Sequence, residues 1–178
     1  MAIGSSTKRG NFLRFLGVWT IQGLWVSLTA AAAWIAMSST RNQSIDGWAV
    51  VGGLIWLLGI TIEVTADLQK SAWNRQHKGW FINVGLWSRS RHPNYFGEIL
   101  LWIGIAIIAL PALSGWQYLG LISPVFVTLL LTKVSGIPLL EKRAEKKWGD
   151  DPDYHRYVER TPVLIPRLSA PRPTRQAE

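Results

Sequence analysis

Three ionisable residues follow one another at helical spacing near the end of a long apolar stretch: Glu63, Asp67 and Lys70. Spacings of four and three place their side chains on one face of a helix, where the carboxylates could accept hydrogen bonds from a ribose or an amide. The uncharged stretch before Glu63 has 16 residues, about 24 Å of helix, against the roughly 30 Å of a hydrocarbon core. Ionisable groups at such depth usually line a cavity or a site. The alternative is a solvated helix end with an internal ion pair.

A second group combines cations with side chains that form hydrogen bonds. Its members are Arg89, Arg91, His92, Asn94, Tyr95 and Glu98. Pro93 suits the first position of a helix, because its φ is fixed and no donor is lost there. The arginines, the histidine and the free N–H groups of that helix start favour an anion. The alternative is a basic loop that binds lipid headgroups, with the amide and carboxylate packing between helices.

A third group lies further along the chain and is rich in basic and aromatic residues. It includes Glu141, Arg143, Lys147, Trp148, Tyr154 and Tyr157. By composition it is an amphipathic helix at a membrane interface. The three groups together fit a large, soluble, anionic cofactor, whose phosphates or carboxylate the cations could hold. The sequence indicates no metal site.

The segments that must position these groups are stretches without charge. Residues 15–40 and 47–62 contain no charged side chain, and neither do the 34 residues between Glu98 and Lys133. The first two are long enough for one span each if the second continues to residue 66. The third is too long for one span, and Pro111 with Gly115 marks a turn, so it predicts a helical hairpin. We therefore expect an all-α integral membrane bundle of four spans plus an amphipathic C-terminal helix. A cleaved signal peptide is the alternative for the first stretch.

The distribution of charge supports this topology. The chain has 178 residues, a net charge of +8 and no cysteine, which excludes a disulfide scaffold, and its 48% apolar content excludes a disordered chain. Of 19 Lys and Arg residues, 18 fall on one side of the predicted spans and only Arg41 on the other. The positive-inside rule then places both termini in the cytoplasm and removes the support for a nucleic-acid partner. We expect a basic segment at 1–14, a transmembrane domain at 15–168 and a disordered tail at 169–178.

The quoted residues also resemble a known family. Glu63-x3-Asp67-x-Gln69-Lys70 and the run from Gly79 to Glu98 resemble the C-terminal half of the steroid 5-alpha-reductase family, in particular a branch of bacterial membrane proteins. Glu141-x-Arg143-x3-Lys147-Trp148-Gly149-x4-Tyr154-x2-Tyr157 resembles the last segment of the same superfamily. That superfamily also contains sterol C14-reductases and isoprenylcysteine carboxyl methyltransferases. The resemblance covers roughly residues 45–168.

The resemblance implies an oxidoreductase of lipid metabolism in the bacterial inner membrane. Such an enzyme uses NADPH to reduce a carbon–carbon double bond of a steroid- or lipid-like enone. It implies that one set of residues binds the cofactor: Glu63, Asp67, Arg91, His92, Asn94, Tyr95, Glu98, Arg143 and Tyr157. The catalytic residue is not identified, although Tyr95 is a candidate. The partners implied are the bilayer and a hydrophobic small molecule.

One departure from the family concerns the N-terminal side. Reductases of this type carry two or three further helices that supply the groups polarising the substrate ketone, whereas only about 45 residues precede the matching region here. We expect one of three arrangements: an N-terminally shortened enzyme, a minimal relative that uses Tyr95 differently, or a subunit that a second polypeptide completes with the missing helices. Two alternatives remain: an S-adenosylmethionine-dependent membrane methyltransferase of the isoprenylcysteine type, and a non-catalytic protein that retains the fold.

Overall fold

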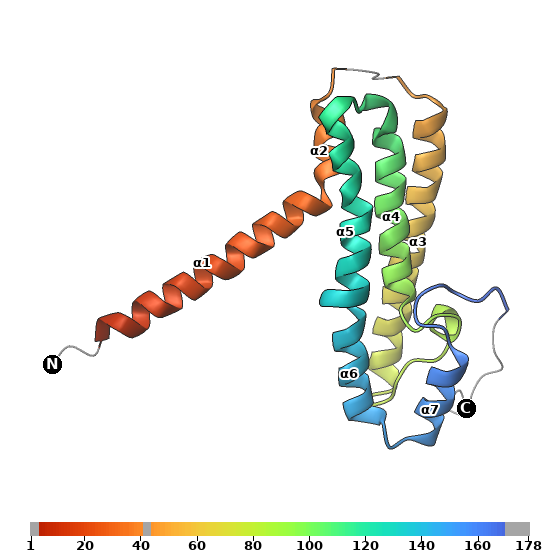
Figure 1. The fold of residues 1–178 in the computed structure, drawn as a ribbon. Coiled ribbons are helices and arrows are strands. Elements are labelled where there is room, and N and C mark those ends of the chain that lie inside the picture. Colours follow the sequence, from red (N-terminus) through yellow and green to blue (C-terminus); the bar gives the residue numbers. More distant parts are fainter. Residues whose placement is uncertain (1–3, 41–43, 170–178) are drawn as a thin grey trace.

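The computed structural model describes residues 4–40 and 44–169, and this part of the chain is helical without strands. The long helices are α1 (Gly4–Thr29), α3 (Gly47–Gln76) and α4 (Pro93–Ala109). The shorter ones are α2 (Ala31–Ser38), α5 (Ile122–Leu129), α6 (Ile137–Trp148) and α7 (Pro152–Arg160). Short 3-10 segments occur at η1 (Gly85–Ser88), η2 (Leu110–Ala112) and η3 (Gly115–Leu121), and a π-helical segment at η4 (Leu130–Val134). Figure 1 shows α2 to α5 side by side, with α6, α7 and η1 at one end of the bundle.

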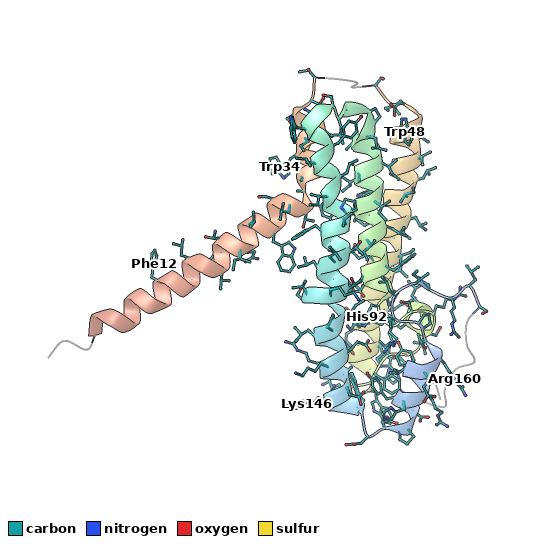
Figure 2. The ribbon with its side chains drawn as sticks, viewed as in Figure 1. Phe12, Trp34, Trp48, His92, Lys146 and Arg160 are labelled. Carbon is teal, nitrogen blue, oxygen red and sulfur yellow. The ribbon has the colours of Figure 1, made fainter. Side chains whose placement is uncertain are left out.

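The helices confirm the predicted membrane bundle. Three continuous helical runs are long and apolar enough to cross a bilayer: Gly47–Gln76, Pro93–Ala112 and Gly115–Trp148. The predicted hairpin turn lies between the last two, and α4 begins at Pro93 as its fixed φ suggested. Two aromatic residues at one end, Trp34 and Trp48, lie away from His92 at the other (Figure 2). The chain is thus an integral membrane protein.

The first predicted span differs from expectation because it is bent. Phe15–Thr29 and Ala31–Ser38 meet at an angle of 60°, and they count as a fourth span only if the bent pair is taken as one. At the bend, the backbone carbonyl of Thr29 accepts a hydrogen bond from the Ser123 hydroxyl of α5. A side chain that binds a helix carbonyl in this way is a known cause of kinks. α1 consequently points away from the bundle (Figure 1), with apolar side chains such as Trp19 exposed. Arg41, which the charge count placed on the opposite side, lies outside the described residues.

α3 and α4 pack in backbone contact through four glycines. A Cβ atom at Gly59 would lie 2.5 Å from the Leu101 nitrogen and 2.7 Å from the Gly97 oxygen. One at Gly52 would lie 2.7 Å from the Gly104 oxygen. Only glycine permits such an approach, and small residues commonly let membrane helices come this close. The contact fixes the two helices that carry the first two groups of polar residues.

The predicted amphipathic C-terminal helix corresponds to α6 and α7. Figure 1 shows α6 continuing along the line of α5, while α7 turns back beside it. The segment after α7 then pairs with the loop before α4. The Arg91 N–H donates to the Pro162 carbonyl at 2.9 Å, and the Arg167 N–H donates to the Arg89 carbonyl at 3.0 Å. These bonds bring the third group of residues against the second.

Candidate functional site

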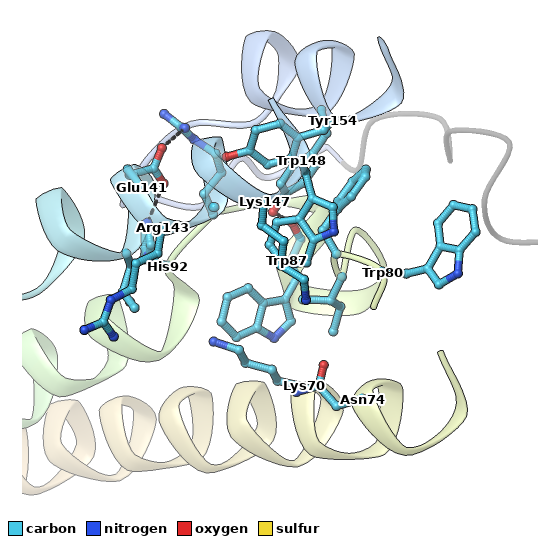
Figure 3. Close-up of a pocket in the computed structure, with 16 residues that line it drawn as sticks. Lys70, Asn74, Trp80, Trp87, His92, Glu141, Arg143, Lys147, Trp148 and Tyr154 are labelled. Atoms are coloured by element: carbon cyan, nitrogen blue, oxygen red, sulfur yellow. Dashed lines mark hydrogen bonds and ion pairs between the residues drawn. The ribbon is translucent and has the colours of Figure 1, made fainter. Parts of the chain in front are cut away.

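A pocket of about 270 Å³ lies at the end of the bundle where α3, α6 and α7 meet the loop before α4 (Figure 3). Its aromatic lining residues are Trp80, Phe81, Trp87, Trp148, Tyr154 and Tyr157. Its charged lining residues are Lys70, Arg91, Arg143, Lys147 and Glu141, with His92 beside them. The pocket is therefore both aromatic and cationic.

Phe81 organises the aromatic wall. Its ring centroid lies 5.4 Å from those of Tyr154 and Tyr157 and 6.0 Å from that of Trp148. Tyr157 also donates a hydrogen bond of 2.8 Å from its hydroxyl to the Trp87 carbonyl. Burial raises the pKa of both Tyr154 and Tyr157, because the charged phenolate is poorly solvated there. Both phenols remain neutral at physiological pH.

Another part of the pocket wall is the turn η1, which α3 holds in place. The Trp87 indole N–H donates to the Ala66 carbonyl at 2.9 Å, and the Leu86 N–H donates to Gln69 Oε1 at 2.9 Å. Gly85 adopts a φ of 61°, a left-handed conformation that favours glycine. A Cβ there would also lie 2.5 Å from Gln69 Oε1. The turn therefore presents Trp87 to the pocket from a fixed position.

Three cations in the pocket are available to a ligand: Lys70, Arg143 and Lys147. Within residues 4–40 and 44–169, none of them forms an ion pair within 4.0 Å. Lys70 Nζ lies 4.8 Å from the centroid of the Trp87 ring, and Lys147 Nζ lies 4.4 Å from that of Trp148. Such cation–π contacts orient the ammonium groups while leaving their charge unneutralised.

The other cations have an internal partner. One oxygen of Glu141 accepts a hydrogen bond from Arg91, and the other lies 2.6 Å from His92 Nε2. Glu141 belongs to a motif that is visible in the sequence, but these contacts were not predicted from it. Arg91 and His92 are 50 and 49 residues away along the chain, so no local spacing indicated the link. In the structure, the carboxylate of Glu141 lies beside Arg91 and His92, and binding of a cofactor anion by these two residues remains a prediction.

The nine residues predicted to bind a cofactor fall into two groups. Arg91, His92, Arg143 and Tyr157 line the pocket. The remaining five do not line it and lie on α3 and α4: Glu63, Asp67, Asn94, Tyr95 and Glu98. Four of these are half-buried, whereas Asp67 is exposed. α3 and α4 lie so close here that a Cβ added at Gly97 would be 2.6 Å from the Glu63 nitrogen. Glu98 on α4 also interacts electrostatically with the α3 carboxylates Glu63 and Asp67.

Lys70 connects the two groups of residues. It lines the pocket, and it interacts electrostatically with Asp67, three residues earlier on α3. The same face of α3 therefore leads from the carboxylates at Glu63 and Asp67 into the pocket at Lys70 and Asn74. From Glu63 to Asn74 it extends about 16 Å, at 1.5 Å per residue.

Comparison with known proteins places the chain in a family. A family profile described as "Protein of unknown function (DUF1295)" matches residues 3–161. The chain belongs to this family. The DUF1295 chain is also similar to a curated protein, Steroid 5-alpha-reductase DET2 from Gossypium hirsutum, with 29% identity over 94 residues. That match covers 50% of this chain and 34% of the relative, so the chain spans about a third of the relative's length. No solved structure matches the chain significantly.

Through this distant relative, the two matches support the assignment of the chain to a membrane reductase-like family. The bacterial branch and the wider superfamily remain predictions from the motifs. The assignment of each of the nine residues to a cofactor also remains a prediction, although their two locations adjoin along α3.

Proposed function

We propose that this DUF1295 protein is a membrane-embedded reductase that uses NADPH to reduce the carbon–carbon double bond of a lipid- or steroid-like enone. The observation that carries the proposal is the aromatic, cationic pocket, from which Lys70 on α3 links electrostatically to Asp67 in the neighbouring group of carboxylates and a tyrosine hydroxyl. The similarity to a protein named as a steroid 5-alpha-reductase supports the same class.

The chemistry of the lining fits the parts of NADPH. Lys70, Arg143 and Lys147 suit phosphate groups, because none of them forms an ion pair within 4.0 Å with another described side chain. The flat rings of Trp87 and Trp148 suit an adenine. The carboxylates of α3 and α4 suit ribose hydroxyls, which donate hydrogen bonds.

The size of the pocket supports a ligand that extends beyond it. Its volume of about 270 Å³ is just under the roughly 300–1,000 Å³ usual for small-molecule sites. We infer that it holds one end of the dinucleotide. The other end would follow α3 toward Glu63 and Glu98.

NADPH, when bound, supplies the hydride, and the chain must stabilise the charge that develops on the substrate oxygen. Donors aimed at that oxygen are usually a large part of such catalysis. Tyr95 is a candidate donor because its hydroxyl lies in the α3–α4 group, near Asp67 and Glu98. We further propose that a second subunit supplies helices that complete the substrate side. The hydrophobic substrate would enter from the bilayer.

We also propose that the protein resides in a bacterial inner membrane with both termini cytoplasmic. The basis is the concentration of Lys and Arg on one side of the spans. The pocket would then open to the cytoplasm, where NADPH is available.

A methyltransferase that uses S-adenosylmethionine is the second candidate, and one observation favours it. The pocket is compact, and S-adenosylmethionine is smaller than a dinucleotide. The three cations without ion pairs argue against it, because S-adenosylmethionine carries no phosphate. A non-catalytic protein that retains the fold is a third candidate.

Ligand-induced stabilisation tests these proposals. The purified protein in detergent is heated with NADPH, NADH or S-adenosylmethionine, because a ligand selective for the folded state adds about 2.7 kcal/mol at 100 times its Kd. We expect NADPH to stabilise most. An Arg143→Ala/Lys147→Ala variant should lose the effect, while a Lys142→Ala/Lys146→Ala control on the same helix, outside the pocket lining, should keep it. Stabilisation by S-adenosylmethionine alone would refute the reductase, and no response to any ligand would favour the non-catalytic protein.

A further inference from the structure

Glu141 is the only carboxylate in the pocket lining within the described residues. Its two oxygens contact different side chains: Arg91 on one side and His92 on the other. These partners immediately precede α4, whereas Glu141 lies in the first turns of α6. The carboxylate therefore joins two helices that reach the pocket from different directions (Figure 3).

We infer that Glu141 is a positioning residue for the cofactor that the proposed function requires. By fixing Arg91 and His92, it holds the beginning of α4 against α6. It thereby sets the position of the α6 cations Arg143 and Lys147, which face the ligand. The inference rests on the proposed function. It gives Glu141 a role in ligand binding that requires no direct contact between Glu141 and the ligand.

The burial of the two partners makes this role specific. The Arg91 and His92 side chains are only 13% and 7% exposed, against 30% for Glu141. Arg91 Nε is buried without a hydrogen-bond partner in the described part of the chain. The guanidinium thus depends on Glu141 for its counter-charge, and a buried ion that loses its partner is strongly unfavourable. Without Glu141, Arg91 must move toward solvent and so change the pocket wall.

Backbone contacts restrict how the wall can adjust. The Arg91 N–H is bound to the Pro162 carbonyl at 2.9 Å, and the Ser90 hydroxyl donates to the Leu164 carbonyl at 2.8 Å. The backbone before α4 is thus held by the C-terminal segment. Loss of Glu141 should therefore displace α6 and its cations more than the backbone at Arg91.

The test compares NADPH affinity, measured by titration with folded protein, across matched variants. We expect Glu141→Gln to weaken binding about tenfold, in line with the loss of a charged hydrogen bond. Glu141→Asp, which keeps the charge on a shorter side chain, should recover part of the affinity. Glu145→Gln is the control, because Glu145 lies four residues further on α6, is exposed and does not line the pocket. In an Arg91→Gln background, Glu141→Gln should have a smaller effect, since the two residues act together.

A purely structural role gives a different result. It would lower the melting temperature of Glu141→Gln while leaving the NADPH affinity of the folded fraction unchanged, and this would overturn the inference. Tighter binding would also overturn it, because Glu141 would then compete with the ligand for Arg91. If the unmodified protein binds no nucleotide, the proposed function and the inference both fail. If the unmodified protein binds NADPH and Glu141→Gln binds it equally well, only the inference fails.

Discussion

The closest helix contact in the bundle gives the sharpest prediction. In Gly59→Ala, the new methyl group would lie 2.5 Å from the Leu101 nitrogen and 2.7 Å from the Gly97 oxygen. Both are backbone atoms, so a side-chain rotation cannot relieve the clash and α3 must move away from α4. Overpacking of this kind costs about 1–3 kcal/mol.

The matched control is Gly53→Ala on the same helix. An added Cβ at Gly53 has nothing within 4 Å, so this variant shows only the gain in helix propensity of about 1 kcal/mol. Because Gly59→Ala shares that gain, the difference between the two variants isolates the helix contact. At about 2–4 °C per kcal/mol for a chain of this size, Gly59→Ala should melt roughly 2–12 °C below Gly53→Ala.

The assay is thermal unfolding of both variants in the same detergent, followed by tryptophan fluorescence. Gel filtration before heating checks that each variant is folded and monodisperse. Equal melting temperatures would refute the reasoning, because they would mean that the two helix backbones do not touch at Gly59.

Three further predictions concern the pocket end and the topology. Tyr157→Phe should cost about 1 kcal/mol at neutral pH, since it removes a buried hydrogen bond, and thermal unfolding measures this. The pKa of Tyr157 is raised in the folded state, so its contribution is complete below about pH 10 and is lost as pH rises above that value; the parent should lose stability there more steeply than Tyr157→Phe. Arg143→Ala should weaken NADPH binding and reduce its salt dependence, whereas Lys142→Ala, outside the pocket lining, should do neither. The chain has no cysteine, so single cysteines at the exposed positions Ser44 and Glu159 should react with impermeant reagents from opposite sides of the membrane, and labelling of both from one side would contradict the topology.

The bundle could be predicted because bilayer constraints are local in sequence. A stretch without charge indicates a span wherever it occurs, and Pro93 and Pro111 mark helix boundaries through their own backbone geometry. The bend after Thr29 could not be predicted in this way. It involves the Ser123 hydroxyl, 94 residues away, and nothing near Thr29 signals that contact.

The same distinction applies to the candidate site. Arg91, His92, Arg143 and Tyr157 belong to recognisable motifs and do line the pocket. The role of Glu141 depends on contacts between segments about 50 residues apart, which one sequence cannot reveal. Cofactor binding by the carboxylates of α3 and α4 remains a prediction, because they lie beside the pocket and not in its lining.

The pairing of residues 162–168 with the loop before α4 also bears on how the protein is made. The ribosome synthesises α3, α4 and α5 before it reaches Tyr154, so insertion of the membrane helices can begin while the pocket still lacks one wall. The backbone bonds at Arg89 and Arg91 can form only afterwards. A premature stop codon just after Gly149 would therefore yield a chain that enters the bilayer normally but has no ligand pocket.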